Sequence, residues 1–113
     1  NPGYHERVPR YLRAVAAAVR EQGEYARLKD PTFMNLLAAV APMHDAGQLV
    51  VPTAILLKPG RLDAEEMSVL QNHTVFGSEV LVDMTARLPA PVPDLTLAAE
   101  VVRHHHERWD GTG

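Results

Sequence analysis

The chain has 113 residues, of which 46% are hydrophobic and 22% charged, as expected of a single domain, residues 1–113, with one core. Lys and Arg number 11 and Asp and Glu 14; a net charge of −3 without a basic run argues against a nucleic-acid polymer as partner. The absence of cysteine excludes disulfides, thiolate metal sites and cysteine nucleophiles. The sequence shows neither a signal peptide nor a membrane segment, so we expect a cytoplasmic protein.

The first two predicted helices carry apolar stripes at helical spacing, and each stripe has a histidine at one end. His5 lies one turn before the first stripe, which consists of Val8, Leu12, Val15 and Val19. The second stripe follows the helix-start signal Asp30-Pro31-Thr32 and closes on His44; it consists of Phe33, Leu36, Leu37 and Val40. Pro42 is expected to bend or loosen the segment before His44.

Residues 48–62 lack a helical period and contain Pro52, Pro59 and Gly60, which predicts a long irregular loop. A third helix should begin at Asp63, with Glu66 as its capping-box partner. Its stripe places His73 inward and includes Gly77, where another element can approach closely; the stripe consists of Met67, Leu70, His73, Gly77, Val80, Leu81 and Met84.

Residues 89–93 contain three prolines, Pro89, Pro91 and Pro93, and are expected to form a rigid connector. The fourth stripe then runs onto two adjacent histidines, His105 and His106; it consists of Leu95, Ala98, Ala99 and Val102. Four helices thus direct imidazoles to one interior, and the predicted fold is an all-α, compact helical bundle.

Imidazoles packed inward without partners would each leave an unmet polar group, at a cost of roughly 1–3 kcal/mol. A shared metal removes that cost. The adjacent His44 and Asp45 offer nitrogen and carboxylate oxygen, and a carboxylate can bridge two metals with its two oxygens. Histidine and carboxylate without sulfur suit Fe, Mn, Zn, Co or Ni. Two such metals about 3.5–4 Å apart would favour phosphodiester hydrolysis.

Three segments resemble the HD-GYP family, a branch of the HD phosphohydrolases, along nearly the whole chain. They are HDAGQLVVPTAILLKPGRL from His44, NHTVFGSEVL around His73, and HHERWDGTG from His105. The resemblance implies the all-α fold of the HD superfamily and a centre of two or three metals, commonly iron or manganese. It also implies cleavage of cyclic di-GMP to pGpG or GMP.

By position, the resemblance implies six metal ligands, with Asp45 as the bridging and catalytic carboxylate; they are His5, His44, Asp45, His73, His105 and His106. Asn1 stands where three-metal members carry glutamate, which favours two divalent ions. His104 has no counterpart in the motif and is expected on a second face of its helix.

Gln48 occupies a catalytic position where the family usually has lysine, and its neutral amide supplies no charge. Lys58 and Arg108 are candidates for substrate binding, although a surface lysine and a loop-holding arginine are the plainer interpretations.

Three interpretations stay open from the sequence: an active cyclic di-GMP phosphodiesterase, a degenerate domain that binds ligands or proteins, and an HD phosphohydrolase for another nucleotide. The replacement at Gln48 favours the second, and the retained histidines favour the first. A longer protein would carry a sensor or receiver domain, and a homodimer is also considered. The family pattern continues beyond Gly113, so the domain is expected to be incomplete at its C-terminus.

Overall fold

The computed structural model describes residues 3–90 and 92–113, and these fall into two units, Asn1–Pro42 and Met43–Gly113. Every regular element within these described ranges is an α-helix or a 3-10 helix, so the all-α prediction is confirmed. The assignment of residues 1–113 to one domain stays a prediction. Among the described helices, none combines the length and the hydrophobicity that a membrane span requires.

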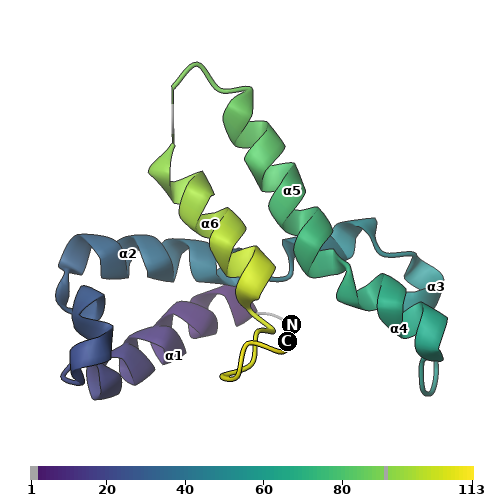
Figure 1. Ribbon diagram of the computed structural model, residues 1–113, viewed down its shortest axis with the longest axis horizontal. Coiled ribbons are helices and arrows are strands. Elements are labelled where there is room, and N and C mark those ends of the chain that lie inside the picture. Colours follow the sequence, from purple (N-terminus) through teal and green to yellow (C-terminus); the bar gives the residue numbers. More distant parts are fainter. Residues whose placement is uncertain (1–2, 91) are drawn as a thin grey trace. The chain divides into compact units, whose positions relative to one another are not determined.

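The first unit consists of two α-helices joined by a 3-10 segment (Figure 1). They are α1 (Tyr4–Val19), η1 (Gly23–Lys29) and α2 (Pro31–Val40). As predicted, α2 starts at Asp30, whose side chain accepts a hydrogen bond of 2.9 Å from the Thr32 backbone N–H. The helix ends before Pro42, and a 3-10 turn, η2 (Ala41–Met43), replaces its next turn.

The buried face of α1 differs from the predicted stripe at one position. Val15 is 61% exposed, whereas Ala16 is 5% exposed and takes its place in the interior. Ala16 lies on the same face as Leu12 and Val19, at spacings of four and three residues, and both of those side chains are half-buried. The buried face of α1 is therefore centred on Ala16, and Val15 lies outside that face.

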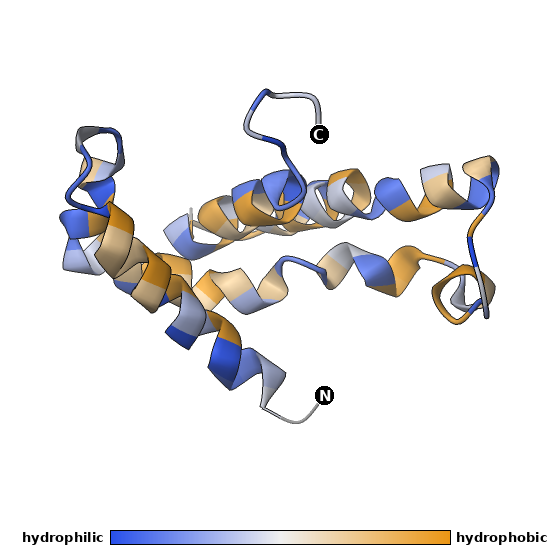
Figure 2. Cartoon of the chain, turned by 90° about the horizontal axis from the view of Figure 1, so that it is seen from below, coloured by the Kyte–Doolittle hydropathy of each residue, from blue (hydrophilic) through white to orange (hydrophobic). Residues whose placement is uncertain are grey.

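The second unit is built on two helices that lie side by side, α5 (His73–Ala86) and α6 (Pro93–His104) (Figure 1). Its core consists of aliphatic residues, among them Leu81, Ala98, Ala99 and Val102. Hydrophobic residues lie on more than one face of α5, where Phe76, Val80 and Met84 are exposed, and the segment after α6 is mostly hydrophilic (Figure 2). Asn1 and Pro91, used in the sequence-based predictions, lie outside the described residues.

The segment expected to be an irregular loop contains two short helical elements. These are η3 (Ala46–Val50) and α3 (Thr53–Leu56), with Pro52 immediately before α3. Proline suits a helix start because its missing N–H would have no partner in the first turn. A connection without regular secondary structure follows from Leu57 to Asp63.

The helix predicted from Asp63 is confirmed at its start and interrupted later. Asp63 and Glu66 form the predicted capping box at the start of α4 (Ala64–Gln71). The helical hydrogen bonding is interrupted at Asn72, and a separate helix, α5, begins at His73. Val80 and Met84, predicted to face the core, are 50% and 49% exposed, because the buried face of α5 contains Gly77, Ser78 and Leu81 instead.

Candidate metal centre

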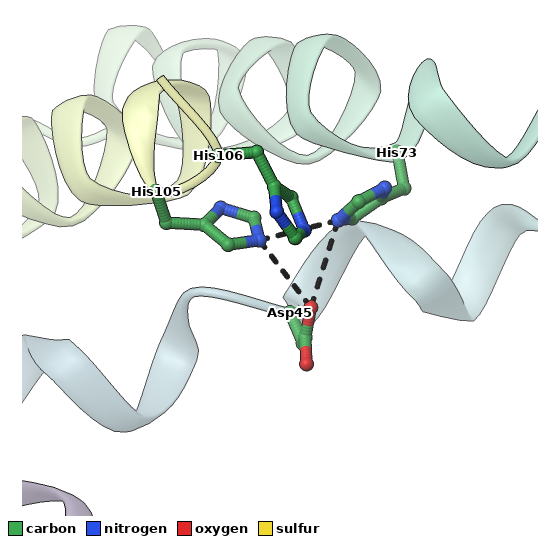
Figure 3. Close-up of side chains that lie close together, drawn as sticks. All are labelled: Asp45, His73, His105 and His106. Carbon is green, nitrogen blue, oxygen red and sulfur yellow. Dashed lines mark hydrogen bonds and ion pairs between the residues drawn. The ribbon is translucent and has the colours of Figure 1, made fainter. Parts of the chain in front are cut away.

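Four side chains from three separate segments converge in the second unit (Figure 3). Asp45 lies in the turn before η3, His73 is the first residue of α5, and His105 and His106 follow the end of α6. Each residue offers one ligand atom, and these atoms lie within 4.8 Å of one another. The predicted convergence of these four residues is therefore seen in the structure.

The geometry is tightest around one oxygen of Asp45. Its Oδ1 lies 3.5 Å from His73 Nε2 and 3.4 Å from His105 Nε2. The two Nε2 atoms are themselves 3.3 Å apart. Three atoms that can each donate a lone pair thus surround one small volume (Figure 3).

Backbone carbonyls fix the orientation of two of the imidazoles. His73 Nδ1 donates to the Leu70 carbonyl at 2.6 Å, and His105 Nδ1 donates to the Val102 carbonyl at 2.8 Å. Because a carbonyl only accepts, both hydrogen bonds require the proton on Nδ1. The Nε2 lone pairs are then directed at the cluster, as in metal-binding histidines.

This arrangement is unfavourable without a cation, since two unprotonated nitrogens and a carboxylate oxygen repel one another at 3.3–3.5 Å. His73 is only 3% exposed, so water cannot relieve that repulsion on its side. Burial lowers the pKa of the His105 imidazole, which keeps this ring neutral and available as a ligand at neutral pH. The cluster can therefore hold a metal ion, and its donor set fits a divalent transition metal.

The second oxygen of Asp45 has a different neighbour. His44 Nε2 lies 3.4 Å from Asp45 Oδ2, and the His44 ring centroid is 5.1 Å from that of His105. One carboxylate therefore presents Oδ1 to His73 and His105, and Oδ2 to His44. This is the arrangement in which a carboxylate can serve two ions at once.

His106 forms the exposed side of the cluster. The His106 ring centroid lies 4.2 Å from that of His105 and 5.4 Å from that of His73. His106 is itself exposed to solvent. Because His73 is buried opposite it, the cluster has a closed inner side and an open outer side.

A close contact between two glycines brings Asp45 to His73. A Cβ atom built on Gly77 would lie 2.8 Å from the Gly47 Cα and 2.7 Å from Val102 Cγ1. A Cβ on Gly47 would lie 1.8 Å from the His73 carbonyl oxygen. The close approach predicted at Gly77 is thus confirmed, whereas Gly47 was missed. Its position two residues after Asp45 is the signal that could have identified it.

Gln48 and Lys58 were predicted near the reaction. Gln48 lies in η3 and is half-buried, and its backbone N–H donates to the Asp45 carbonyl at 2.9 Å. Lys58 follows α3, and its Nζ is 2.5 Å from Glu66 Oε2. Glu66 also closes the α4 capping box, so Lys58 pairs with the start of α4. Its role in substrate binding stays a prediction.

Arg108 lies in a terminal loop that closes on itself. Glu107 Oε1 accepts hydrogen bonds from the backbone N–H groups of Arg108 and Gly113, at 3.0 and 2.7 Å, and these bonds lower the pKa of Glu107. Asp110 Oδ1 accepts from the Thr112 N–H at 3.1 Å. The Arg108 guanidinium reaches Thr112 Oγ1 at 3.5 Å, which agrees with a loop-holding role.

The two remaining histidines, His5 and His104, are not among the four clustered residues. His104 is exposed on α6, with its Nε2 3.7 Å from Glu100 Oε2, as expected of a residue on a second face. His5 lies in the first turn of α1, in the other unit, where its ring packs edge-on against Tyr4 at 5.7 Å. A role for His5 as a metal ligand stays a prediction.

Comparison with known protein families gives a match over most of the chain. A family model described as "HD domain" matches residues 10–112. A cyclic di-GMP phosphodiesterase of Vibrio cholerae is 36% identical over 95% of this chain and 22% of its own length. A cyclic di-GMP phosphodiesterase of Thermotoga maritima is 42% identical over 72% of the chain and 20% of its own length.

A third relative differs in the substrate that its name gives. It is a 3'3'-cGAMP-specific phosphodiesterase of Vibrio cholerae, 38% identical over 70% of this chain and 14% of its own length. The chain thus spans less than a quarter of the length of each of these relatives. The resemblance inferred from the sequence motifs is confirmed by these matches.

Proposed function

The chain belongs to the HD domain family, and from this membership we propose that it is a metal-dependent phosphodiesterase that hydrolyses cyclic di-GMP to pGpG or GMP. The observation that carries the proposal is the disposition of Asp45, whose Oδ1 faces His73 and His105 while its Oδ2 faces His44. A carboxylate shared in this way suits a pair of ions that act on one phosphodiester. The names of the Vibrio cholerae and Thermotoga maritima relatives support cyclic di-GMP as the substrate.

The proposed centre holds two divalent ions, iron or manganese. Its ligands would be His44, Asp45, His73, His105 and His106, with His5 as a further candidate. Such ions, when bound, would polarise the phosphodiester and provide a nucleophile at neutral pH. The nitrogen and oxygen donors, without sulfur, support this class of metal.

The residues of the chain have distinct parts in this proposal. His73 and His105 hold fixed tautomers through their bonds to backbone carbonyls, so their Nε2 atoms need no reorganisation to act as ligands. His106 borders the open side, where the dinucleotide enters. Gln48 would donate a hydrogen bond to a substrate phosphate but would not neutralise its charge. Arg108 stays a candidate for phosphate binding.

A second substrate has specific support. One of the relatives above is named as specific for 3'3'-cGAMP, and the metal ligands act on the phosphodiester, which both cyclic dinucleotides share. An HD phosphohydrolase for another nucleotide is therefore the competing proposal. The replacement of lysine at Gln48 supports a third, in which the domain binds a ligand without cleaving it.

The decisive experiment incubates the longer protein that contains this chain and continues past Gly113, loaded anaerobically with iron or manganese, with cyclic di-GMP and separately with 3'3'-cGAMP. Chromatography then identifies linear and mononucleotide products. We expect cleavage of cyclic di-GMP, and loss of cleavage in Asp45→Asn. Asp94→Asn, an exposed carboxylate at the start of α6, is the matched control. Turnover of cyclic di-GMP no faster than that of Asp45→Asn would refute the proposal.

The proposal extends to the setting of the domain. The domain would act as the output module of a longer bacterial signalling protein with a sensor or receiver domain. This proposal is supported by the fact that the chain matches only 22% and 20% of the length of two relatives. A homodimer stays a prediction.

A further inference from the structure

The first unit contains a hollow of about 250 Å³ between α1, η1 and α2. Its α1 wall is formed by residues at helical spacing, with Arg13 and Arg20 at either end and Ala16 between them. Lys29 borders it where η1 ends, and Met34 and Asn35 border it from α2. We call the space lined by these six residues the basic hollow.

Three cations surround the basic hollow, and one carboxylate partly balances them. Glu21 lies 3.4 Å from Arg20 Nε and 3.2 Å from Lys29 Nζ, and its side chain is 70% exposed. Arg13 Nη2 donates to Asn35 Oδ1 at 3.0 Å, and this neutral oxygen removes none of the guanidinium charge. The local surplus is two positive charges.

This surplus stands out from the charge of the rest of the chain. Residues 1–42 contain six Lys and Arg against four Asp and Glu, a net charge of +2. Residues 43–113 contain five Lys and Arg against ten Asp and Glu, a net charge of −5. An anion would therefore be drawn to the first unit, and within it to the hollow where the cations converge.

The volume and the lining residues of the basic hollow indicate which anions it can bind. A phosphomonoester carries roughly −1.5 to −2 charges at pH 7, which matches the surplus, and arginine guanidinium groups bind phosphate oxygens in a fork. Small-molecule sites usually begin at about 300 Å³, so a volume near 250 Å³ admits a phosphate with at most a small organic group. Ala16 and Met34 offer that group an apolar surface. A cyclic dinucleotide is too large.

From these observations we propose that the basic hollow binds a phosphate dianion, either inorganic phosphate or the phosphate of a small monoester. Arg13 from α1 and Lys29 from the end of η1 hold its oxygens. Glu21 competes with the ligand for Arg20 and Lys29, so ligand binding displaces the Glu21 carboxylate. None of the residues that line this site is a proposed metal ligand.

Calorimetric titration of the 113-residue protein tests the proposal, with a chelator present so that phosphate cannot report on metal at the His-Asp cluster. One titration uses inorganic phosphate and the other glycerol 3-phosphate, at low ionic strength. Lys29→Gln and Arg13→Gln should each weaken binding about three- to tenfold, as expected of partly exposed charge contacts. Glu21→Gln should instead tighten binding about threefold, because it removes the competing carboxylate.

Arg10→Gln is the matched control, since Arg10 is an exposed arginine of α1 outside the hollow. The Arg10→Gln variant should bind phosphate with the same affinity as the unmodified protein. Circular dichroism checks that each variant is folded. If Arg13→Gln does not fold, the comparison of Glu21→Gln with the unmodified protein still tests the proposal. Binding of both ligands indicates a monoester site, and binding of phosphate alone indicates a site for the free ion; both support the proposal. No saturable binding up to about 10 mM, or weaker binding in Glu21→Gln, would overturn it.

Discussion

Replacing Gly47 with alanine should disturb the metal centre without touching any of its ligands. The added Cβ would lie 1.8 Å from the His73 carbonyl oxygen and 3.0 Å from the Gly77 backbone nitrogen. Both neighbours are backbone atoms of α5, so neither can rotate away. Relieving the closer contact to the tolerated limit of 3.0 Å requires a shift of at least 3.0 − 1.8 = 1.2 Å between η3 and α5.

That shift acts directly on Asp45, which lies two residues before Gly47, and on its 3.5 Å approach to His73. Overpacking of this kind costs about 1–3 kcal/mol of folding free energy. Displacement of one ligand by more than an ångström should weaken metal binding by about 10- to 100-fold, the range seen when the groups that support a ligand are lost.

Two measurements on the same variant separate these effects. Thermal unfolding of the metal-free protein reports the loss of stability, and calorimetric titration with manganese reports the loss of affinity. Gly23→Ala is the control, because a Cβ at Gly23 meets no heavy atom within 4 Å, and it should change neither quantity. If Gly47→Ala unfolds at the same temperature and binds manganese as tightly as the unmodified protein, the backbone contact does not position Asp45.

Three further outcomes are expected. Asp45→Asn should lower manganese affinity by about 10- to 100-fold or more in calorimetry, because the amide carries no charge to share between two ions; unchanged affinity would contradict the bridging role. Gln48→Lys should raise cyclic di-GMP turnover about tenfold, the effect of about 1.4 kcal/mol of transition-state stabilisation by a cation near the phosphate; unchanged turnover in a kinetic assay would count against it. Glu66 has a lowered pKa, chiefly through its bond from Lys58, so its contribution to stability is present above the ordinary value of 4.5 and is lost as the pH falls through the folded pKa. The difference in unfolding temperature between Glu66→Gln and the unmodified protein should therefore be seen at pH 7 and vanish in acid; a difference independent of pH would refute it.

The clustered histidines of the second unit were predictable because helical periodicity determines which residues share a face. His73 lies on the same face as Gly77 and Leu81, at spacings of four and eight residues, and all three are buried. The same reasoning placed His105 at the end of the α6 stripe, and it lies there, three residues after the buried Val102. These predictions needed only local regularity and the motif around each histidine.

The interruption at Asn72 was not predictable in this way. The stripe from Met67 to Met84 keeps a helical period across Asn72, so the pattern alone favours one helix. In the structure, the Leu70 carbonyl accepts a hydrogen bond from the His73 ring, which fixes the tautomer needed for the cluster. The interruption at Asn72 thus accompanies a hydrogen bond that orients a residue of the cluster.

The disposition of Asp45 shows why the residue types in a site can be inferred before its geometry. The sequence supplies a carboxylate with two oxygens, but which neighbour each oxygen faces depends on how η3 crosses α5. That crossing requires a glycine on both sides, Gly47 on η3 and Gly77 on α5, because a side chain on either would collide with backbone of the other. The pairing of Oδ1 with His73 and of Oδ2 with His44 is therefore a consequence of backbone contact, and a substitution at either glycine would alter the centre while leaving every ligand in the sequence.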